Sequence, residues 1–248
     1  IQQLMLGVGA SKKTYLDDVF SNQLYNGTSA THAINNGIDL AGEGGLVWTK
    51  ARNQSWSNLL IDTVRGGDKV IFSELGNAQA ERSDLITSFN NNGYTAGVDS
   101  FYGSINYNTA DVVSWTFRKA KGFCDVVTYT GNSSTQSIAH NLGCVPGMIL
   151  FKSTSSSHNW GVYHRGTGNR TVLALNTNGG TQTASDGYFQ ATTPTATHFY
   201  LDNWTQGNNS GDTYVAYLFA GGESTAATAR SVDFDGDDYL SLPVDSDL

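Results

Sequence analysis

The chain has 248 residues, a formal net charge of −8, and 28 glycines against 3 prolines. Apolar residues make up 39% of it, which is enough for a packed core and too many for a disordered chain. The acidic balance, with no local cluster of Lys and Arg, argues against a nucleic-acid partner. No run of about 18 apolar residues is present, so no membrane span is predicted.

The sequence repeats one pattern at a spacing of about a hundred residues. The copies span residues 18–118 and 124–220. An apolar strand ending in lysine occurs in both, at 46–50 and 149–152, and so does a closing aromatic strand, at 112–117 and 214–219. A repeat of this size is a whole domain rather than a solenoid unit of roughly 20–50 residues. We therefore expect an extended, modular protein.

The predicted elements are strands. Residues 46–48 and 148–151 are short continuous apolar runs, as in buried strands. Period-2 alternation is clearest in 111–117. Residues 212–220 carry apolar groups on both faces, which favours a central strand of a two-sheet sandwich. Residues 77–89 lack alternation and are predicted to hold a short helix.

Turn signals built on Gly, Asn and Asp punctuate the chain at short intervals, because these residues tolerate positive φ. The sequence therefore predicts an all-β protein with two tandem, jelly-roll-like β-sandwich domains from an internal duplication, plus the beginning of a third module. The predicted boundaries are an N-terminal leader at 1–17, repeat 1 at 18–118, a joint at 119–123, repeat 2 at 124–220, a linker at 221–229 and a truncated β domain at 230–248.

The sequence at each end of the chain predicts that it is part of a longer protein. The chain begins at Ile1 rather than Met, so we expect a segment before it. The pattern that starts at Arg230 reads as a strand, a tight turn and a second strand, and it stops at Leu248, too soon for a domain.

Four segments carry a family resemblance. They are Asp17-Asp18-Val19-Phe20, Ile34-Asn35-Asn36-Gly37-Ile38-Asp39-Leu40, Gly42-Glu43-Gly44-Gly45-Leu46-Val47-Trp48 and Tyr214-Val215-Ala216-Tyr217-Leu218-Phe219-Ala220. These segments resemble virion proteins of tailed bacteriophages, notably those of marine cyanobacteria and related hosts. The resemblance covers nearly the whole chain. Residues 231–240 look like the first hairpin of a concanavalin A-like lectin domain, with which such proteins often continue.

The resemblance implies a non-enzymatic structural component of a phage virion, a tail fibre or spike that takes part in host-cell attachment at the particle surface. It implies a homotrimer, other virion proteins as partners and a host surface glycan as a candidate partner. It supplies no catalytic, cofactor-binding or metal-binding residue. One alternative is a capsid decoration or vertex protein. Another is a carbohydrate-binding or carbohydrate-cleaving module, with these loop aromatics as sugar platforms: Trp56, Tyr102, Trp160 and Trp204.

The histidines give no metal site by spacing. They are His32, His140, His158, His164 and His198. His158 and His164 flank Trp160 and Tyr163, a group that suits stacking on a sugar ring. The favoured interpretation is an aromatic strand with Trp160 in the core, because the matching region of the first copy has Trp56 without histidines.

The carboxylates give no secure site either. One set resembles a calcium loop in spacing, without its Gly and Glu in register, and is interpreted as solvated charge: Asp233, Asp235, Asp237 and Asp238. A second set offers a glycosidase acid and base that the second copy lacks: Asp62, Asp68, Glu74, Glu81 and Asp84. No Gly-x-Ser-x-Gly nucleophile motif occurs. No catalytic residue, cofactor or metal is therefore assigned.

Two further features concern pairing and partners. The spacing of Cys124 and Cys144 permits a disulfide, although free cysteines are favoured. The Ser-rich loop at 153–158 differs from the loop at 53–58 in the first copy. Because repeats differ most where they meet different partners, we expect the two copies to contact different neighbours.

Overall fold

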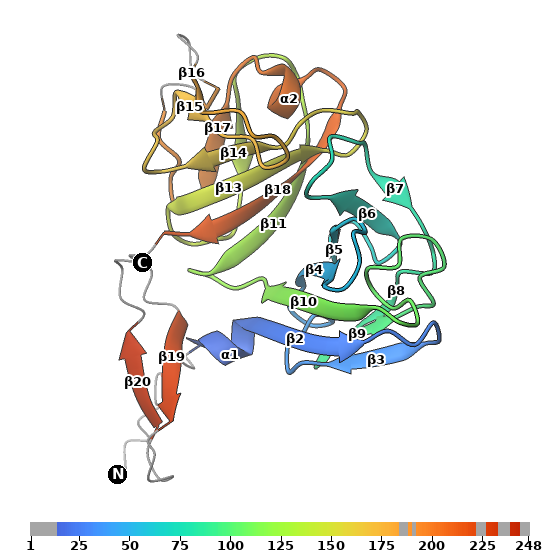
Figure 1. The fold of residues 1–248 in the computed structure, drawn as a ribbon. Helices are drawn as coiled ribbons and strands as arrows, with labels where there is room; N and C mark the ends of the chain where they lie inside the picture. Colours follow the sequence, from blue (N-terminus) through green and yellow to red (C-terminus); the bar gives the residue numbers. More distant parts are fainter. Residues whose placement is uncertain (1–13, 184–187, 190–191, 222–226, 233–238, 244–248) are drawn as a thin grey trace, which may run out of the picture.

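The structure is a computed structural model that describes residues 14–183, 188–189, 192–221, 227–232 and 239–243. These residues form mainly antiparallel β-sheets (Figure 1), which confirms the predicted all-β class. The helices that they contain, α1 (Leu16–Val19) and α2 (Thr205–Asn208), are single turns. No helix in this part of the chain is long and apolar enough to cross a membrane.

The first copy is a sandwich of a six-stranded sheet and a three-stranded sheet. The large sheet has the order β2 (Phe20–Asn26), β10 (Asp111–Arg118), β4 (Gly45–Ala51), β5 (Leu59–Asp62), β6 (Lys69–Phe72) and β7 (Ala80–Glu81). The small sheet has the order β3 (His32–Asn35), β9 (Gly93–Ala96) and β8 (Ile86–Asn90). A core that includes Ile34, Val47, Ile61 and Tyr94 fills the space between them.

The second copy repeats this plan. Its large sheet has the order β11 (Cys124–Thr130), β18 (Thr213–Ala220), β13 (Pro146–Ser153) and β14 (Gly161–His164). Two small sheets cover it: β12 (Gln136–Ala139) with β17 (His198–Leu201), and β15 (Thr171–Val172) with β16 (Gln182–Thr183). Strands β11, β18, β13 and β14 pair in the order of β2, β10, β4 and β5, and β12–β17 matches β3–β9. The central position predicted for 212–220 is confirmed by β18.

The two large sheets pack directly against each other, and the small sheets lie outside them (Figure 1). Leu46, Leu60 and Ile71 of the first copy share one core with residues of the second copy that include Leu150 and Val215. Inner strands therefore need apolar side chains on both faces. One face contributes to this shared core, and the other face contributes to the core of the strand's own copy. Because the copies are joined in this way, they do not form the extended pair expected from the repeat.

A buried polar group crosses the shared core. Arg65 Nε donates to Asp62 Oδ2 at 2.6 Å, and the Tyr217 hydroxyl of the second copy donates to the same oxygen at 2.8 Å. Arg65 Nη2 donates to the Tyr217 hydroxyl at 3.0 Å, and burial raises the pKa of Tyr217 well above its ordinary value. Nearby, Trp160 Nε1 donates to the Phe72 carbonyl at 2.7 Å. These bonds satisfy polar groups that would otherwise be costly to bury.

Lys152 on β13 is also buried at this interface. Its Nζ donates to the carbonyls of Gly76 in the first copy, at 3.2 Å, and of Ser153, at 2.9 Å. Burial lowers the pKa of Lys152 from its ordinary 10.5 to about 8. The charged lysine is therefore held by carbonyl dipoles in a site that disfavours its charge.

Residues 77–89 do not contain the predicted helix; they form β7, a connection and most of β8. Their backbone N–H groups bond to other segments rather than to the preceding turn. Gln79 N donates to Thr154 O, and Arg82 N donates to Asp68 O. Because the neighbouring copy and the β6 loop supply the acceptors, an extended path satisfies this backbone.

The C-terminal part pairs with the start of the described chain. Strand β1 (Thr14–Tyr15) runs parallel to β19 (Ala227–Val232), which pairs antiparallel with β20 (Tyr239–Pro243). Two strands were predicted here, and β19 begins inside the segment predicted as a linker. The turn at 233–238, with its four aspartates, lies outside the described residues.

We predict that Tyr217→Phe lowers the free energy of unfolding by about 1–3 kcal/mol, because it removes two buried hydrogen bonds and leaves the ring in place. Urea denaturation measures this loss, and Tyr200→Phe, at a partly exposed tyrosine, is the control. Equal stability of the Tyr217 variant and the parent would show that the Tyr217 hydroxyl contributes nothing to stability.

We predict a pH-dependent stability term from Lys152. Between about pH 8 and 10.5 the unfolded chain keeps a proton on this lysine that the folded chain has lost, so stability rises with pH in that window. The unfolding free energy of the parent relative to Lys152→Met is expected to increase by about 1–3 kcal/mol from pH 7 to pH 10. Lys50→Met, at the matching position of β4, is the control. A difference that stays constant across this range would contradict the prediction.

Candidate functional site

Each copy contains one fully buried asparagine that ties three loops together. In the first copy, Asn106 Oδ1 accepts the N–H of Thr28 at 2.9 Å. Its Nδ2 donates to the carbonyls of Ala30 and Gly97, both at 2.5 Å. Asn106 therefore joins the turn after β2, the end of β9 and the segment that leads into β10.

Asn208 makes the corresponding bonds in the second copy. Its Oδ1 accepts the N–H of Asn132 at 3.0 Å, and its Nδ2 donates to the carbonyls of Ser134 at 2.7 Å and Asp202 at 2.8 Å. Sequence reasoning missed both asparagines. Their signal was their identical spacing before the two closing strands.

The turns held by these asparagines share an unusual backbone. Ser29 and Ser133 have φ values of 51° and 55°, and their N–H groups donate to the carbonyls of Asn106 and Asn208. Serine is uncommon in the left-handed region of backbone conformation. Its presence there at the same place in both copies indicates that both turns are under the same constraint. The duplication thus preserves the loop anchors.

Beside each anchor, a loop of the large sheet meets the segment that enters the closing strand. The loop joins β4 to β5 in the first copy and β13 to β14 in the second, and the closing strands are β10 and β18. We call this meeting point the corner. Thr49 pairs with Leu59 in the first copy and Phe151 with Gly161 in the second, so the two loops have the same length. Trp56 therefore corresponds to His158. Because each follows its anchoring asparagine directly, Tyr107 corresponds to Asn209.

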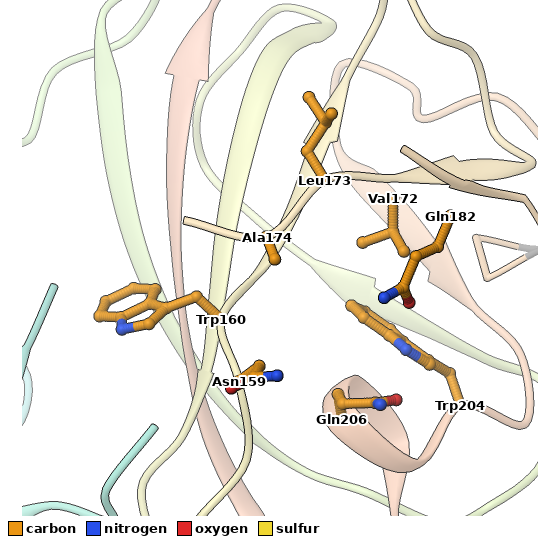
Figure 2. A pocket seen from close by; sticks show the side chains of 8 residues that line it. All are labelled: Asn159, Trp160, Val172, Leu173, Ala174, Gln182, Trp204 and Gln206. Carbon is orange, nitrogen blue, oxygen red and sulfur yellow. The ribbon is translucent and has the colours of Figure 1, made fainter. Parts of the chain in front are cut away.

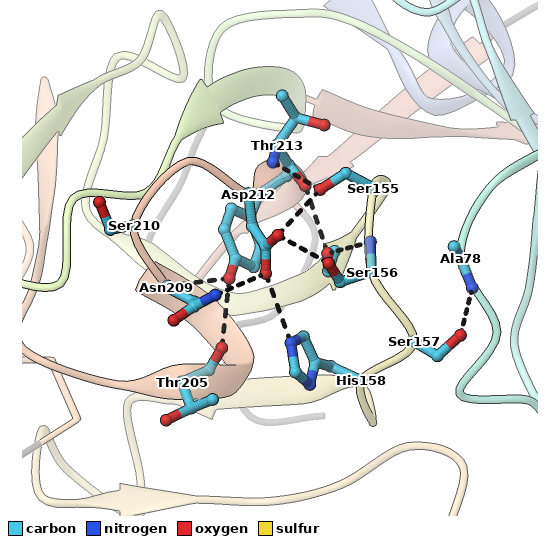
Figure 3. A network of polar contacts seen from close by, with 12 residues as sticks. Ala78, Ser155, Ser156, Ser157, His158, Thr205, Asn209, Ser210, Asp212 and Thr213 are labelled. Carbon is cyan, nitrogen blue, oxygen red and sulfur yellow. Dashed lines mark hydrogen bonds and ion pairs between the residues drawn. The ribbon is translucent and has the colours of Figure 1, made fainter.

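The corner of the second copy is polar (Figure 3). The Asp212 carboxylate accepts from Ser156 Oγ at 2.6 Å and Asn209 Nδ2 at 3.0 Å, and it lies 3.4 Å from His158 Nε2. The hydrogen bond from Ser156 is the main cause that lowers the pKa of Asp212. The N–H of Thr213 donates to Ser155 Oγ at 2.9 Å. This network fastens the Ser-rich loop to the start of β18.

The same network brings Ser, His and Asp together without forming a catalytic triad. In a triad the histidine lies between the nucleophile and the acid and accepts the proton of the nucleophile. Here the carboxylate lies between them, because Ser156 and His158 both contact Asp212. The arrangement holds loops in place and offers no activated serine.

The corner of the first copy is aromatic. Trp56 and Tyr107 form an edge-to-face pair with ring centroids 5.4 Å apart. A Cβ on Gly103 would lie 2.5 Å from Trp56 Cε3, so the indole packs directly against this glycine, whose φ is +78°. No larger residue fits there without displacing the ring.

Phe101 lies in the same loop as Gly103 and Tyr107. Its side chain is 69% exposed, it packs edge-to-face with Tyr102 at 4.9 Å, and the Arg82 guanidinium lies 4.8 Å from its ring centroid. Arg82 is itself bonded to Asp84 at 3.4 Å. We call the set Trp56, Phe101, Tyr102 and Tyr107 the aromatic corner.

Only part of the predicted sugar platform is accessible. Trp160 and Trp204 are 1% and 4% exposed, so these two rings are core residues, whereas Trp56 and Tyr102 are half-buried. Sequence reasoning missed Phe101 and Tyr107. A signal was present in the loop lengths, since nine residues separate Ala96 from Asn106 but six separate Leu201 from Asn208.

A pocket beside Trp204 is too small for a ligand (Figure 2). It is lined in part by the amide side chains of Asn159, Gln182 and Gln206. Its volume of about 20 Å³ has room for one water molecule. A sugar ring or cofactor does not fit, and we do not assign a function to this pocket.

Two of the carboxylates weighed from sequence are engaged in the fold, whereas Glu81 is exposed. Asp62 bonds to Arg65, and Glu74 accepts the N–H of Asn58. Within the described ranges, no three His, Cys, Asp or Glu residues are placed to hold a metal ion. Cys124 and Cys144 are both free, as favoured, and burial raises the pKa of each thiol.

The comparisons with known proteins give one match. Residues 16–226 match the sequence model of a family described as a domain of unknown function, DUF7483. The chain belongs to this DUF7483 family. The match begins at α1 and includes both copies, so the DUF7483 unit corresponds to the fused pair rather than to one sandwich. No curated protein and no solved structure matches the chain.

We predict that Asn106→Ala and Asn208→Ala each lower the free energy of unfolding by about 2 kcal/mol or more, because each change removes at least three hydrogen bonds from a buried position. Chemical denaturation measures both losses. Asn203→Ala, at an exposed position of the second copy, is the control and should stay within about 0.5 kcal/mol of the parent. A loss at only one anchor would contradict their equivalence.

Proposed function

We propose that this DUF7483 chain is a non-enzymatic structural component of a phage virion, a tail fibre or spike that takes part in host-cell attachment. The resemblance of both copies to exposed virion proteins supports the location. The proposal places the protein at the surface of the particle, among other virion proteins. The homotrimer that we include in it rests on the resemblance alone.

The core shared by the two large sheets is the observation that carries the mechanical part of the proposal. Two sandwiches joined by a loop alone would bend relative to each other. Packing Leu60 and Ile71 against Val215 and Trp160 removes that freedom, because separation would expose a large apolar face to water. A stiff body of this kind suits a part that carries a binding module away from a particle.

The polar clusters support a structural role. Asp212 accepts a hydrogen bond from Ser156 and so fastens the Ser-rich loop to the start of β18. Asp62 accepts a hydrogen bond from Tyr217 and so joins the two copies. In both cases several local donors bond to the carboxylate. These arrangements account for the conspicuous polar side chains by stability alone.

One observation favours a second role within the same proposal. The aromatic corner exposes rings on one copy, as a carbohydrate-binding surface does. Glycan binding fits an adhesive fibre and does not require cleavage. The decoration-protein alternative differs only in position on the particle, so localisation decides between the two.

We predict that immunogold, with antibody raised against residues 18–220, labels tail fibres or the tail of intact phage particles from the source lysate. Pre-immune serum is the control. Label spread over the head would replace the fibre proposal with a decoration role. Particles that carry no gold, with label in free solution or on cells, would contradict a virion location.

A further inference from the structure

The aromatic corner exposes more apolar surface than a structural loop needs. Phe101 is 69% exposed, and Tyr107 and Val98 of the same loop are 43% and 41% exposed. Single exposed apolar residues are ordinary, but three within ten residues of one loop are a concentration of apolar surface. Exposed apolar surface gathered in this way suits a contact with a ligand or partner.

The loop is fixed in its observed shape before any ligand arrives. The buried Asp99 carboxylate accepts the N–H groups of Tyr102, at 3.1 Å, and Ile105, at 2.8 Å. Asn106 anchors the far end of the loop, and Arg82 lies over the Phe101 ring. Little conformational entropy is left to lose on binding, which is the advantage of a preorganised site.

The surroundings of the rings match a sugar better than an apolar partner. A pyranose presents a C–H face that stacks on aromatic rings and a rim of hydroxyls that bonds to amides. Gln54 lies two residues before Trp56, Asn108 directly follows Tyr107, and both residues are exposed. Asn53 fastens the two segments by donating to Thr109 O at 2.8 Å and accepting from Asp111 N at 3.0 Å.

Charge selects among sugars. The chain carries a net charge of −8, which repels acidic glycans and nucleic acid at long range. The cation beneath Phe101, Arg82, is paired with the Asp84 carboxylate, which offsets its attraction for an acidic ligand. A neutral glycan meets neither obstacle.

The second copy supplies an internal comparison. His158 and Asn209 replace Trp56 and Tyr107, and the loop that carries Phe101 is three residues shorter there. The anchors are kept while the rings are lost, so folding alone does not require this aromatic surface. We propose that the aromatic corner of the first copy binds a neutral pyranose glycan. This inference rests on the proposed function, since it names the ligand class of the attachment role.

The test is binding of the full chain to a printed array of neutral and acidic pyranose oligosaccharides, followed by calorimetric titration with the strongest neutral binder. We expect Phe101→Ala to weaken binding at least tenfold with little change in thermal midpoint, and the double change Trp56→His with Tyr107→Asn to weaken binding at least tenfold. Leu175→Ala, at an exposed apolar residue of the second copy, is the matched control and should bind as the parent does.

Phe101 is exposed, so its variant remains informative even where the double variant fails to fold. Binding to no array glycan, binding to acidic glycans only, or binding unchanged by Phe101→Ala would each overturn the inference. Gold-labelled fibres together with no glycan binding would leave the proposed function standing and remove this inference alone. Glycan binding without particle labelling would do the reverse.

Discussion

The face-to-face burial of the two large sheets is the constraint on which the rest of the structure depends. It forces β5 and β18 to carry apolar side chains on both faces, since each lies between two cores. It also places Asp62, Arg65 and Tyr217 out of water, where each must find its partners within the protein. The stiffness that we assign to the module follows from this one contact.

Duplication has kept some parts of the unit and changed others for physical reasons. The buried asparagines and left-handed serines persist, because losing them would leave loop carbonyls and N–H groups without partners. The corners beside them are free to diverge, because their contacts lie at the surface. One corner has become the polar fastening around Asp212, and the other an aromatic surface that includes Phe101.

The sequence predicted the features that depend on local pattern. Alternation in β10, apolar groups on both faces of β18 and the repeat itself were readable because periodicity reports burial. The shared core could not be predicted from the sequence, because a strand that is buried on both faces has the same pattern whichever sheet covers it. Trp160 and Trp56 look alike in sequence, yet one is core and one is part of a surface, because long-range packing decides their exposure. Residues 77–89 lacked a helix because distant carbonyls accept their N–H groups.

Hydrogen exchange of the full chain across a urea series tests the central claim, that the two copies form one folding unit. The account predicts that the slow amides of β10 and β18 lose protection together, at the same urea concentration and with the same slope. If the strands of one copy kept their protection after those of the other had lost theirs, the copies would be independent domains. The shared core would then not be the contact that holds the molecule together.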